Sequence, residues 1–456
     1  MEQQGGLFGF LEKYLMGPMG IIAQYKIVRA ITAAGMAAVP FTIVGSMFLV
    51  FSVLPQSFSF WPIVADIFAA SFDKFQALYM IAYYATMGVL SLYFVLSMGY
   101  ELTKIYAEEE DLNMNPLNGA MLSLFAFIMT VPQIIFEKGA MSAVISLKEG
   151  AVIADGWAMG NGVTRFGTTG IFTAIIMAIV TVQLYRLCIK KNWVIKMPDA
   201  VPEGVSRGFS ALIPGFVVAF TVLFINGFLI MLGTDIFKVI AIPFSFVTHL
   251  TNSWIGLMII YFLTQLLWIV GIHGANIIFA FVSPIALANM ASNASEGTRY
   301  IVAGEFSNMF VIAGGSGATL GLCIWLATRA KSEQLSAIGK ASIVPGVFNI
   351  NEPLIFGIPI IYNPSLAVPF ILAPMTSATI YYLAMELNLI KAVFAQVPWP
   401  TPVGIGAFLG TGDLKAVVVA LICTIAAFLV YYPFIRMYDT KLHKEEMEMA
   451  AESAIS

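Results

Sequence analysis

Two carboxamides and a carboxylate stand at the centre of one apolar stretch, residues 343–364 (IVPGVFNINEPLIFGIPIIYNP). They are Asn349, Asn351 and Glu352, and prolines and glycines interrupt the stretch on both sides of them. In a bilayer, backbone that cannot remain helical is buried in protein or lines a wet cavity. The pattern therefore predicts a re-entrant hairpin near residues 341–364 that holds a polar ligand. The alternative is a loop on the membrane surface that exposes Glu352.

A histidine lies at a second break between apolar runs. His273 stands in IVGIHGANIIFAF, between Gly271 and Gly274. An imidazole in this position is suited to bind a hydroxyl or a carboxylate. It could instead hydrogen-bond the backbone across the helix break. Asn276, three residues further on, would share its face in a helix, and we expect both residues to contact substrate.

A third broken segment, near residues 394–412, predicts a second re-entrant hairpin. Pro398, Pro400 and Pro402 preclude a regular helix there, and Trp399 lies between the first two. Sugars present a face of C–H bonds that suits an aromatic ring, while their hydroxyls require polar partners. Trp399 with the carboxamides, the carboxylate and the imidazole therefore indicates a sugar site. A tryptophan of the interfacial aromatic belt is the alternative.

Other small and polar residues have plainer interpretations. We interpret Gly314, Gly315 and Gly317 as sites of close helix packing, because no strand precedes them and no lysine follows, as a phosphate loop would require. Arg207 is typical of a cytoplasmic positive residue, and a contact with substrate at a cytoplasmic gate is the alternative. Glu305 either marks a membrane boundary or pairs inside the protein.

The composition defines the class of protein. The 456 residues are 59% hydrophobic and 11% charged, with a mean hydropathy of +0.87, whereas soluble domains carry about 25% charged residues. The net charge of −3 comes without a basic block, so a nucleic-acid partner is not expected. The three cysteines lack CxxC spacing, which predicts neither a disulfide framework nor a metal site, and no cofactor is expected.

Apolar runs recur about ten times, each long enough to cross about 30 Å of hydrocarbon. The sequence therefore predicts an all-α polytopic membrane protein with about ten transmembrane helices and two re-entrant hairpins. Lysines and arginines precede the first run and follow the fourth, eighth and tenth, which places both termini in the cytoplasm. The acidic loop at 101–111 should share that side. Leu7 and Phe8 begin an apolar pattern that predicts a short interfacial helix at the start of the chain.

The chain is expected to divide near residue 250. Residues 1–250 hold plain spans and end in a short interfacial linker helix at 235–249. Residues 251–437 carry most of the polar and broken features, and residues 438–456 form a cytoplasmic tail. We find no clear internal repeat.

Three motifs of the chain resemble those of a known family of membrane proteins. FNINEPLIFGIPIIYNP, GIHGANI and PWPTP are similar to the membrane subunit, IIC, of the lactose/cellobiose/diacetylchitobiose family of sugar phosphotransferase systems, and the similarity covers nearly the whole chain. It implies a homodimer in a bacterial plasma membrane, with the first half as dimer contact and scaffold. It implies that the second half carries a disaccharide in an elevator-like movement. Glu352 and His273 would lie near the hydroxyl that is phosphorylated, with Asn351 and Trp399 as further sugar contacts.

The resemblance also implies a reaction and its partners. In such systems a phosphorylated cysteine of a IIB subunit, itself supplied by IIA, transfers its phosphoryl group to the sugar. Cys188 lacks the glycine- and serine-rich surroundings expected of such a cysteine, so we expect the chain to act as a permease that needs a separate IIB. Glu352 is the candidate base for the sugar hydroxyl, and His273 would orient it. The ending EMEMAAESAIS favours a cellobiose, diacetylchitobiose or related β-linked sugar over lactose.

Three other functions fit parts of the pattern. A cation-coupled secondary sugar transporter would use Glu352 as a proton carrier and would not need IIB. A channel would need a continuous polar stripe, which the spans lack. A membrane enzyme acting alone would need a nucleophile or a metal cluster, and none is visible in the sequence.

Overall fold

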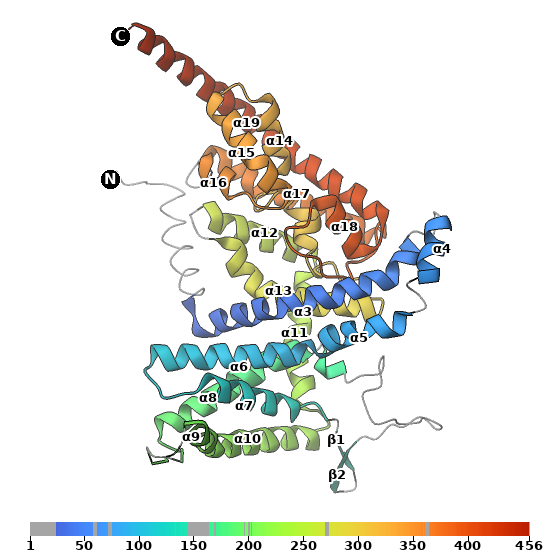
Figure 1. Cartoon of the computed structure of the whole chain (residues 1–456), viewed down its shortest axis with the longest axis vertical. Helices are drawn as coiled ribbons and strands as arrows, with labels where there is room; N and C mark the ends of the chain where they lie inside the picture. Colours follow the sequence, from blue (N-terminus) through green and yellow to red (C-terminus); the bar gives the residue numbers. More distant parts are fainter. Residues whose placement is uncertain are drawn as a thin grey trace. The chain divides into compact units, whose positions relative to one another are not determined.

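The computed structural model of the chain is mostly helical (Figure 1). Residues 1–23, where a short interfacial helix is expected, lie outside the described part. The described residues are 24–57, 62–71, 75–132, 134–137, 139–143, 164–167, 170–195, 197–198, 201, 203–269, 273–358, 360 and 364–455.

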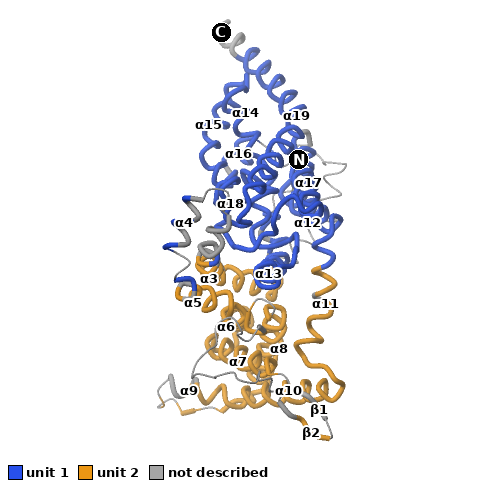
Figure 2. Tube along the Cα trace, turned by 90° about the vertical axis from the view of Figure 1, so that its right-hand side faces the viewer, with its two compact units in different colours: residues 1–21, 49–76, 249–456 blue, residues 22–48, 77–248 orange. Residues whose placement is uncertain are grey.

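These residues form two compact units (Figure 2). Unit 2 takes in the described residues of 22–48 and 77–248, and unit 1 takes in those of 49–76 and 249–456. The chain passes from one unit to the other within helix α3 (Lys26–Ser57) and within helix α11 (Ile236–Thr251). A helix thus occupies the expected linker segment. The functional division expected near residue 250 stays a prediction.

In unit 2, helix α6 packs against α7 and α8, which also contact each other. Small residues allow the α6–α7 approach: a Cβ at Gly99 or Gly119 would overlap atoms of the facing helix. An antiparallel hairpin of β1 and β2 departs from the all-α expectation. The elements of unit 2 besides α3 and α11 are α5 (Gln76–Thr86), η3 (Met87–Val89), α6 (Leu90–Glu109), α7 (Pro116–Ile128), β1 (Ile134–Glu137), β2 (Ala140–Ala143), η4 (Thr164–Phe166), α8 (Ile171–Lys190), α9 (Glu203–Ser210) and α10 (Leu212–Met231).

In unit 1, α17 packs along α19 and contacts α12, while α14 packs against α15. Its elements are α4 (Pro62–Ser71), α12 (Trp254–Ile269), α13 (Gly274–Ser295), the π-helical turn η6 (Ser307–Val311), α14 (Leu320–Arg329), α15 (Glu333–Val347), α16 (Glu352–Gly357), α17 (Pro364–Glu386), α18 (Val403–Thr411) and α19 (Leu414–Ile455). The expected tail, residues 438–456, continues α19 as far as Ile455.

The apolar run at 309–327 is not one helix, so the interpretation of its glycines as part of a packed helix is wrong, although a Cβ at Gly317 would overlap Phe370 of α17. The helix stops after η6 and resumes only at Leu320. Gly314, Gly315 and Gly317 have φ of +84°, +95° and +86°, a left-handed region that glycine enters without a steric penalty. Residues 312–319 therefore form a buried, non-helical loop, which we call the glycine loop.

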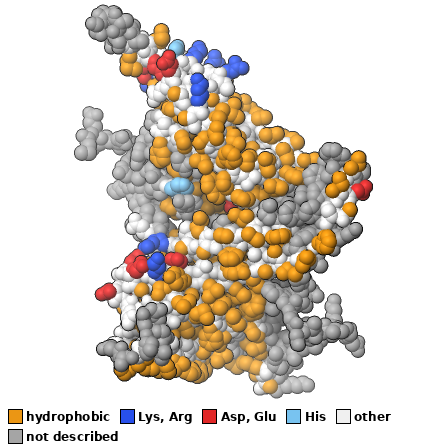
Figure 3. All heavy atoms as spheres, viewed as in Figure 1, with side chains coloured by type: hydrophobic (Ala, Val, Ile, Leu, Met, Phe, Trp, Pro, Cys, Tyr) orange, Lys and Arg blue, Asp and Glu red, His pale blue; other side chains and the backbone are white. Residues whose placement is uncertain are grey.

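Six described helical segments are long and apolar enough to cross a membrane, or seven if α11 and α12, which meet at 82°, count as one span. α7 and α14 are apolar but shorter. The expected count of about ten spans stays a prediction. Figure 3 shows hydrophobic side chains over most of the visible face, with charged side chains gathered in a few places, as a protein surrounded by lipid requires.

One group of charges lies at one end of unit 2. Glu110, just after α6, accepts hydrogen bonds from Lys26, Arg186 and Lys190 at 2.7–3.0 Å. Glu109 pairs with Lys26 and Arg29. These ion pairs confirm that Glu109 and Glu110 share a side with the basic residues before the first span and after the fourth, but the expected loop at 101–111 is wrong in part, because residues 101–109 continue α6. Lys190 above all, then Lys26 and Arg186, lower the pKa of Glu110 to about 2.

We predict that Glu110→Gln destabilises the protein by about 1–2 kcal/mol at pH 7, because a partly exposed ion pair contributes up to about 1 kcal/mol and three cations would lose their shared partner. The folded-state pKa of Glu110 is depressed, so its contribution is complete above the ordinary value of 4.5 and is lost as the pH falls toward 2. The gap in thermal unfolding temperature between wild type and variant should therefore narrow as the pH is lowered through that range.

Glu108→Gln is the matched control, since Glu108 is exposed on the same helix and has no ion pair in the described part of the chain. Glu108→Gln should leave the unfolding temperature unchanged both at pH 7 and as the pH is lowered through that range. Equal effects of the two variants would contradict the prediction.

Candidate functional site

The first broken segment contains a turn held by an asparagine. Helix α15 ends at Val347, and α16 begins at Glu352. Between them, Asn349 has φ +61°, a left-handed conformation that asparagine tolerates better than most residues. The backbone N–H groups of Asn349 and Ile350 donate back to carbonyl oxygens at the end of α15. The break lies where the prolines and glycines predicted it.

The side chain of Asn349 joins three non-helical segments. Its Oδ1 accepts from the N–H of Gly314 at 2.9 Å, in the glycine loop. Its Nδ2 donates to the carbonyl oxygens of Trp399 and Thr401 at 2.9 and 3.1 Å, in the second broken segment. Asn349 is 6% exposed. It therefore holds the backbone of Trp399 against the turn that precedes Glu352.

Asn351, expected to contact sugar, bonds the glycine loop. It is 3% exposed, and its Nδ2 donates to the carbonyl oxygen of Ser316 at 2.5 Å and to Thr319 Oγ1 at 2.9 Å. A Cβ at Gly315 would lie 2.6 Å from the Asn351 carboxamide, so that close approach requires glycine. The Asn351 amide nitrogen is thus engaged within the protein, and its role as a sugar contact stays a prediction.

His273 lies just before α13 and packs against α12. Its ring centroid is 4.3 Å from that of Trp268. Gly274, the next residue, approaches the Thr264 carbonyl of α12 so closely that a Cβ would overlap it. Trp268 belongs to the same buried cluster as Leu354 and Ile355 of α16. These contacts bring His273 into the region of the segment that begins with Glu352.

The remaining expected residues are only partly described. Trp399 is 49% exposed, which suits either a ligand contact or an interfacial position. Glu352 is the first residue of α16, and Asn276 lies in the first turn of α13, but their side chains lie outside the described part. Arg207 belongs to α9 of unit 2, and its side chain also lies outside it.

Glu305, left undecided between a boundary and an internal position, is bonded inside unit 1. Asn308 Nδ2 donates to its Oε2 at 2.7 Å, and Gln396 Nε2 donates to its Oε1 at 2.9 Å. Gln396 is 5% exposed and lies in the second broken segment. Sequence reasoning missed Gln396, although a glutamine next to VPWP was visible. The hydrogen bond between Gln396 and Glu305 holds the start of the second broken segment against the residues that precede η6.

Sequence reasoning also missed Gln265 and Trp268 of α12. Gln265 is the only carboxamide in the run WIGLMIIYFLTQLLWI, and a lone amide in an apolar helix is a usable signal. Among the described residues, no group of three His, Cys, Asp or Glu could hold a metal ion. The described side chains of the candidate site are therefore amides, aromatic rings and an imidazole.

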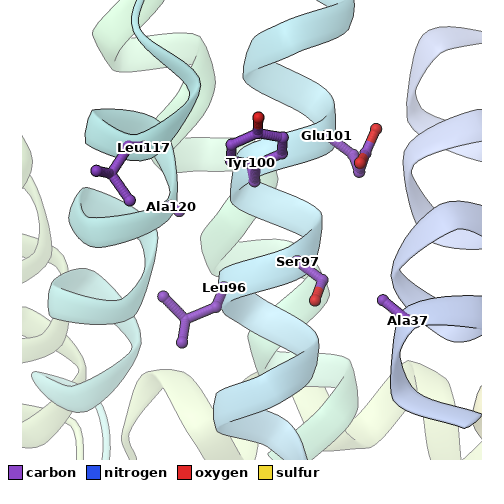
Figure 4. Close-up of a pocket in the computed structure, with 7 residues that line it drawn as sticks. All are labelled: Ala37, Leu96, Ser97, Tyr100, Glu101, Leu117 and Ala120. Carbon is purple, nitrogen blue, oxygen red and sulfur yellow. The ribbon is translucent and has the colours of Figure 1, made fainter. Parts of the chain in front are cut away.

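A separate groove lies in unit 2 and includes none of the expected residues. It has a volume of about 310 Å³ and lies between α3, α6 and α7, with Tyr100, Ser97 and Glu101 as its polar members (Figure 4). Leu96, Leu117 and two alanines supply its apolar surface. The expected sugar site is thus not this groove.

Long apolar helices, two broken segments and buried amides define a multi-pass helical membrane protein with a polar site in one unit. Residues 33–374 match the family described as "Phosphotransferase system, EIIC". The chain belongs to this family, as an EIIC permease of its lactose/cellobiose/chitobiose branch. The expected family resemblance is confirmed.

Relatives match over almost their full lengths. The lichenan permease IIC component of Bacillus subtilis (strain 168) is 33% identical over 96% of this chain and 95% of its own length. The cellobiose-specific EIIC component of Geobacillus stearothermophilus is 33% identical with the same coverage. The crystal structure of ChbC, the IIC component of an N,N'-diacetylchitobiose-specific system, is similar with a TM-score of 0.82 and 32% identity, over 96% of this chain and 99% of that one.

We predict that Asn349→Gly destabilises the protein by about 2–3 kcal/mol, since three hydrogen bonds of about 1 kcal/mol each are lost. Asn349→Ala should destabilise the protein by about 1 kcal/mol more than Asn349→Gly, because the left-handed conformation is unfavourable for alanine but not for glycine. Thermal unfolding of the purified protein in detergent measures both.

Asn388→Ala is the matched control, since Asn388 also has a positive φ (+56°) but is exposed and donates only one long bond, of 3.4 Å. Asn388→Ala should lower the free energy of unfolding by no more than about 1 kcal/mol, the amount that alanine loses in a left-handed conformation. If Asn349→Gly is as stable as wild type, Asn349 does not hold the three segments together.

Proposed function

We propose that this permease binds a β-linked disaccharide, such as cellobiose or diacetylchitobiose, and presents it for phosphorylation by a separate IIB subunit that IIA recharges. The main support is the set of sugars named for its relatives: lichenan, oligo-β-mannoside, cellobiose, lactose and N,N'-diacetylchitobiose. Cellobiose, lactose and diacetylchitobiose are all two pyranose rings joined by a β-linkage. Neutral amides and aromatic rings suit such a ligand.

The proposal includes an architecture. About ten spans and two re-entrant hairpins, near residues 341–364 and 394–412, cross or enter the plasma membrane of a bacterium, with both termini in the cytoplasm. Residues 1–250 form the scaffold and the contact of a homodimer. Residues 251–437 carry the sugar across in an elevator-like movement. The hydrogen bonds that Asn349 donates to the carbonyl oxygens of Trp399 and Thr401 support it, because they join the two proposed hairpins, which could then move together.

The chemistry proposed for the site uses Glu352 and His273. The primary hydroxyl oxygen of the sugar attacks the phosphorus of the phosphocysteine on IIB. A P–O bond forms as the S–P bond breaks, the cysteine leaves as a thiolate, and the hydroxyl proton passes to the Glu352 carboxylate. His273 orients the hydroxyl, and its contact with Trp268 fixes the plane of its ring. Asn276, Asn351, Trp399 and Arg207 are the further proposed substrate contacts.

We predict that Glu352→Gln retains sugar binding within a few-fold but loses phosphorylation by about 10²–10⁴-fold, the usual contribution of a general base. The measurement is the transfer of phosphate from phosphorylated IIB to radiolabelled cellobiose by the permease in vesicles. Glu333→Gln, at an exposed position at the start of α15, is the control and should transfer at the wild-type rate.

The same vesicles separate the proposal from a cation-coupled transporter. Uptake should require phosphorylated IIB and persist when an ionophore removes the proton gradient. Uptake without IIB that collapses with the gradient would favour the cation-coupled alternative, with Glu352 as proton carrier. Normal phosphorylation by Glu352→Gln would remove Glu352 from the reaction.

A further inference from the structure

One face of α12 points three polar side chains into the interior of unit 1. Tyr261, Gln265 and Trp268 are four and three residues apart, a spacing that places them on the same side of a helix. Tyr261 and Gln265 are fully buried, and Trp268 is 5% exposed. These three residues are not part of the site expected from the sequence.

In the described part of the chain, one of the three has a hydrogen-bond partner. The Tyr261 hydroxyl donates to Ser307 Oγ at 2.9 Å. Among the described residues, neither amide atom of Gln265 has a hydrogen-bond partner, and the indole N–H of Trp268 has none either. Buried polar atoms of folded proteins are nearly always hydrogen-bonded, because an unpaired one loses its bonds to water without replacement. The amide nitrogen and amide oxygen of Gln265 and the indole N–H of Trp268 thus remain unpaired among the described residues, all within one helical turn.

These unused groups lie in the region of the candidate site. The Trp268 ring contacts His273, and Trp268 shares a buried cluster with Leu354 and Ile355 of α16 and with Ala318 of the glycine loop. The end of α12 and the segment that begins with Glu352 therefore contribute to one buried cluster. Gln265 precedes Trp268 by less than one turn.

We propose that Gln265 and Trp268 form a second, uncharged contact surface for the sugar, which rests on the proposed function. A carboxamide matches a pair of adjacent pyranose hydroxyls: its oxygen accepts from one, and its N–H₂ donates to the oxygen of the next. The indole N–H donates to a third sugar oxygen. The surface selects a neutral vicinal diol, and Trp268 also supports the ring of His273.

The test separates a ligand contact from a structural role by two measurements. Gln265→Met replaces the amide with an apolar side chain of similar length. If the amide serves the sugar, the affinity should fall about tenfold to a hundredfold, as expected for lost hydrogen bonds in a dry site. The unfolding temperature of the sugar-free protein should stay or rise, because an unpaired polar group has been removed from the interior. Trp268→Phe should weaken binding while it keeps an aromatic ring.

Matched controls come from other buried and unpartnered groups. Ser342 in α15 and Thr181 in α8 have buried hydroxyl oxygens with no hydrogen-bond partner among the described residues. Ser342→Ala and Thr181→Val should leave sugar affinity unchanged. Tyr261→Phe should lower the unfolding temperature, because its hydroxyl has a partner in the protein.

Calorimetric titration with cellobiose, diacetylchitobiose and lactose supplies the affinities. If the wild type binds none of them, the proposed function itself fails. If the wild type binds one and Gln265→Met binds it equally well, this inference fails alone. A joint fall of affinity and unfolding temperature would indicate a structural glutamine and would also overturn it.

A second measurement needs no variant. Monodeoxy analogues of the bound disaccharide, titrated against the wild type, should lose about tenfold or more in affinity at two neighbouring positions of one ring. If removal of any single hydroxyl changes the affinity less than threefold, no vicinal pair is recognised and the proposal is wrong.

Discussion

Non-helical backbone inside an apolar protein must be hydrogen-bonded, and in unit 1 asparagine side chains provide those bonds. Asn252 Oδ1 accepts from the N–H groups of Ile301 and Val302. Asn293 Nδ2 donates to the carbonyl oxygens of Tyr300 and Val393, and Asn289 Nδ2 donates to that of Val302. Asn349 and Asn351 do the same for the glycine loop. The broken segments can therefore exist because carboxamides replace the missing helical partners.

This use of asparagine changes how the site is understood. Asn349 and Asn351 both donate amide hydrogens to backbone carbonyl oxygens, so they stabilise the non-helical segments of the candidate site. Among the described residues, the buried polar atoms without a hydrogen-bond partner include those of Gln265 and the indole N–H of Trp268, which lie on a regular helix. A rigid helix is a better platform for ligand contacts than a broken segment, because its own backbone bonds are already satisfied.

The sequence predicted the helical membrane class and a break within residues 343–364, which the structure has at 348–351. Prolines, glycines and apolar runs are local signals, and they predict local breaks well. The glycine loop was mistaken for a packed helix because glycine serves both purposes, and only the observed φ angles distinguish them. The role of Asn349 depends on partners 35 and 50–52 residues away in the chain, which local spacing does not reveal.

Side chains of α19 accept hydrogen bonds from the backbone N–H groups at the amino end of α15. The N–H groups of Lys331 and Ser332 donate to Asp439, and those of Glu333 and Gln334 donate to Glu446, both from α19. The amino end of a helix ordinarily attracts phosphate through these same N–H groups and its partial positive charge. Here two carboxylates already neutralise it. The amino end of α15 therefore does not attract anions, so a phosphoryl group that approaches unit 1 is not drawn to bind there.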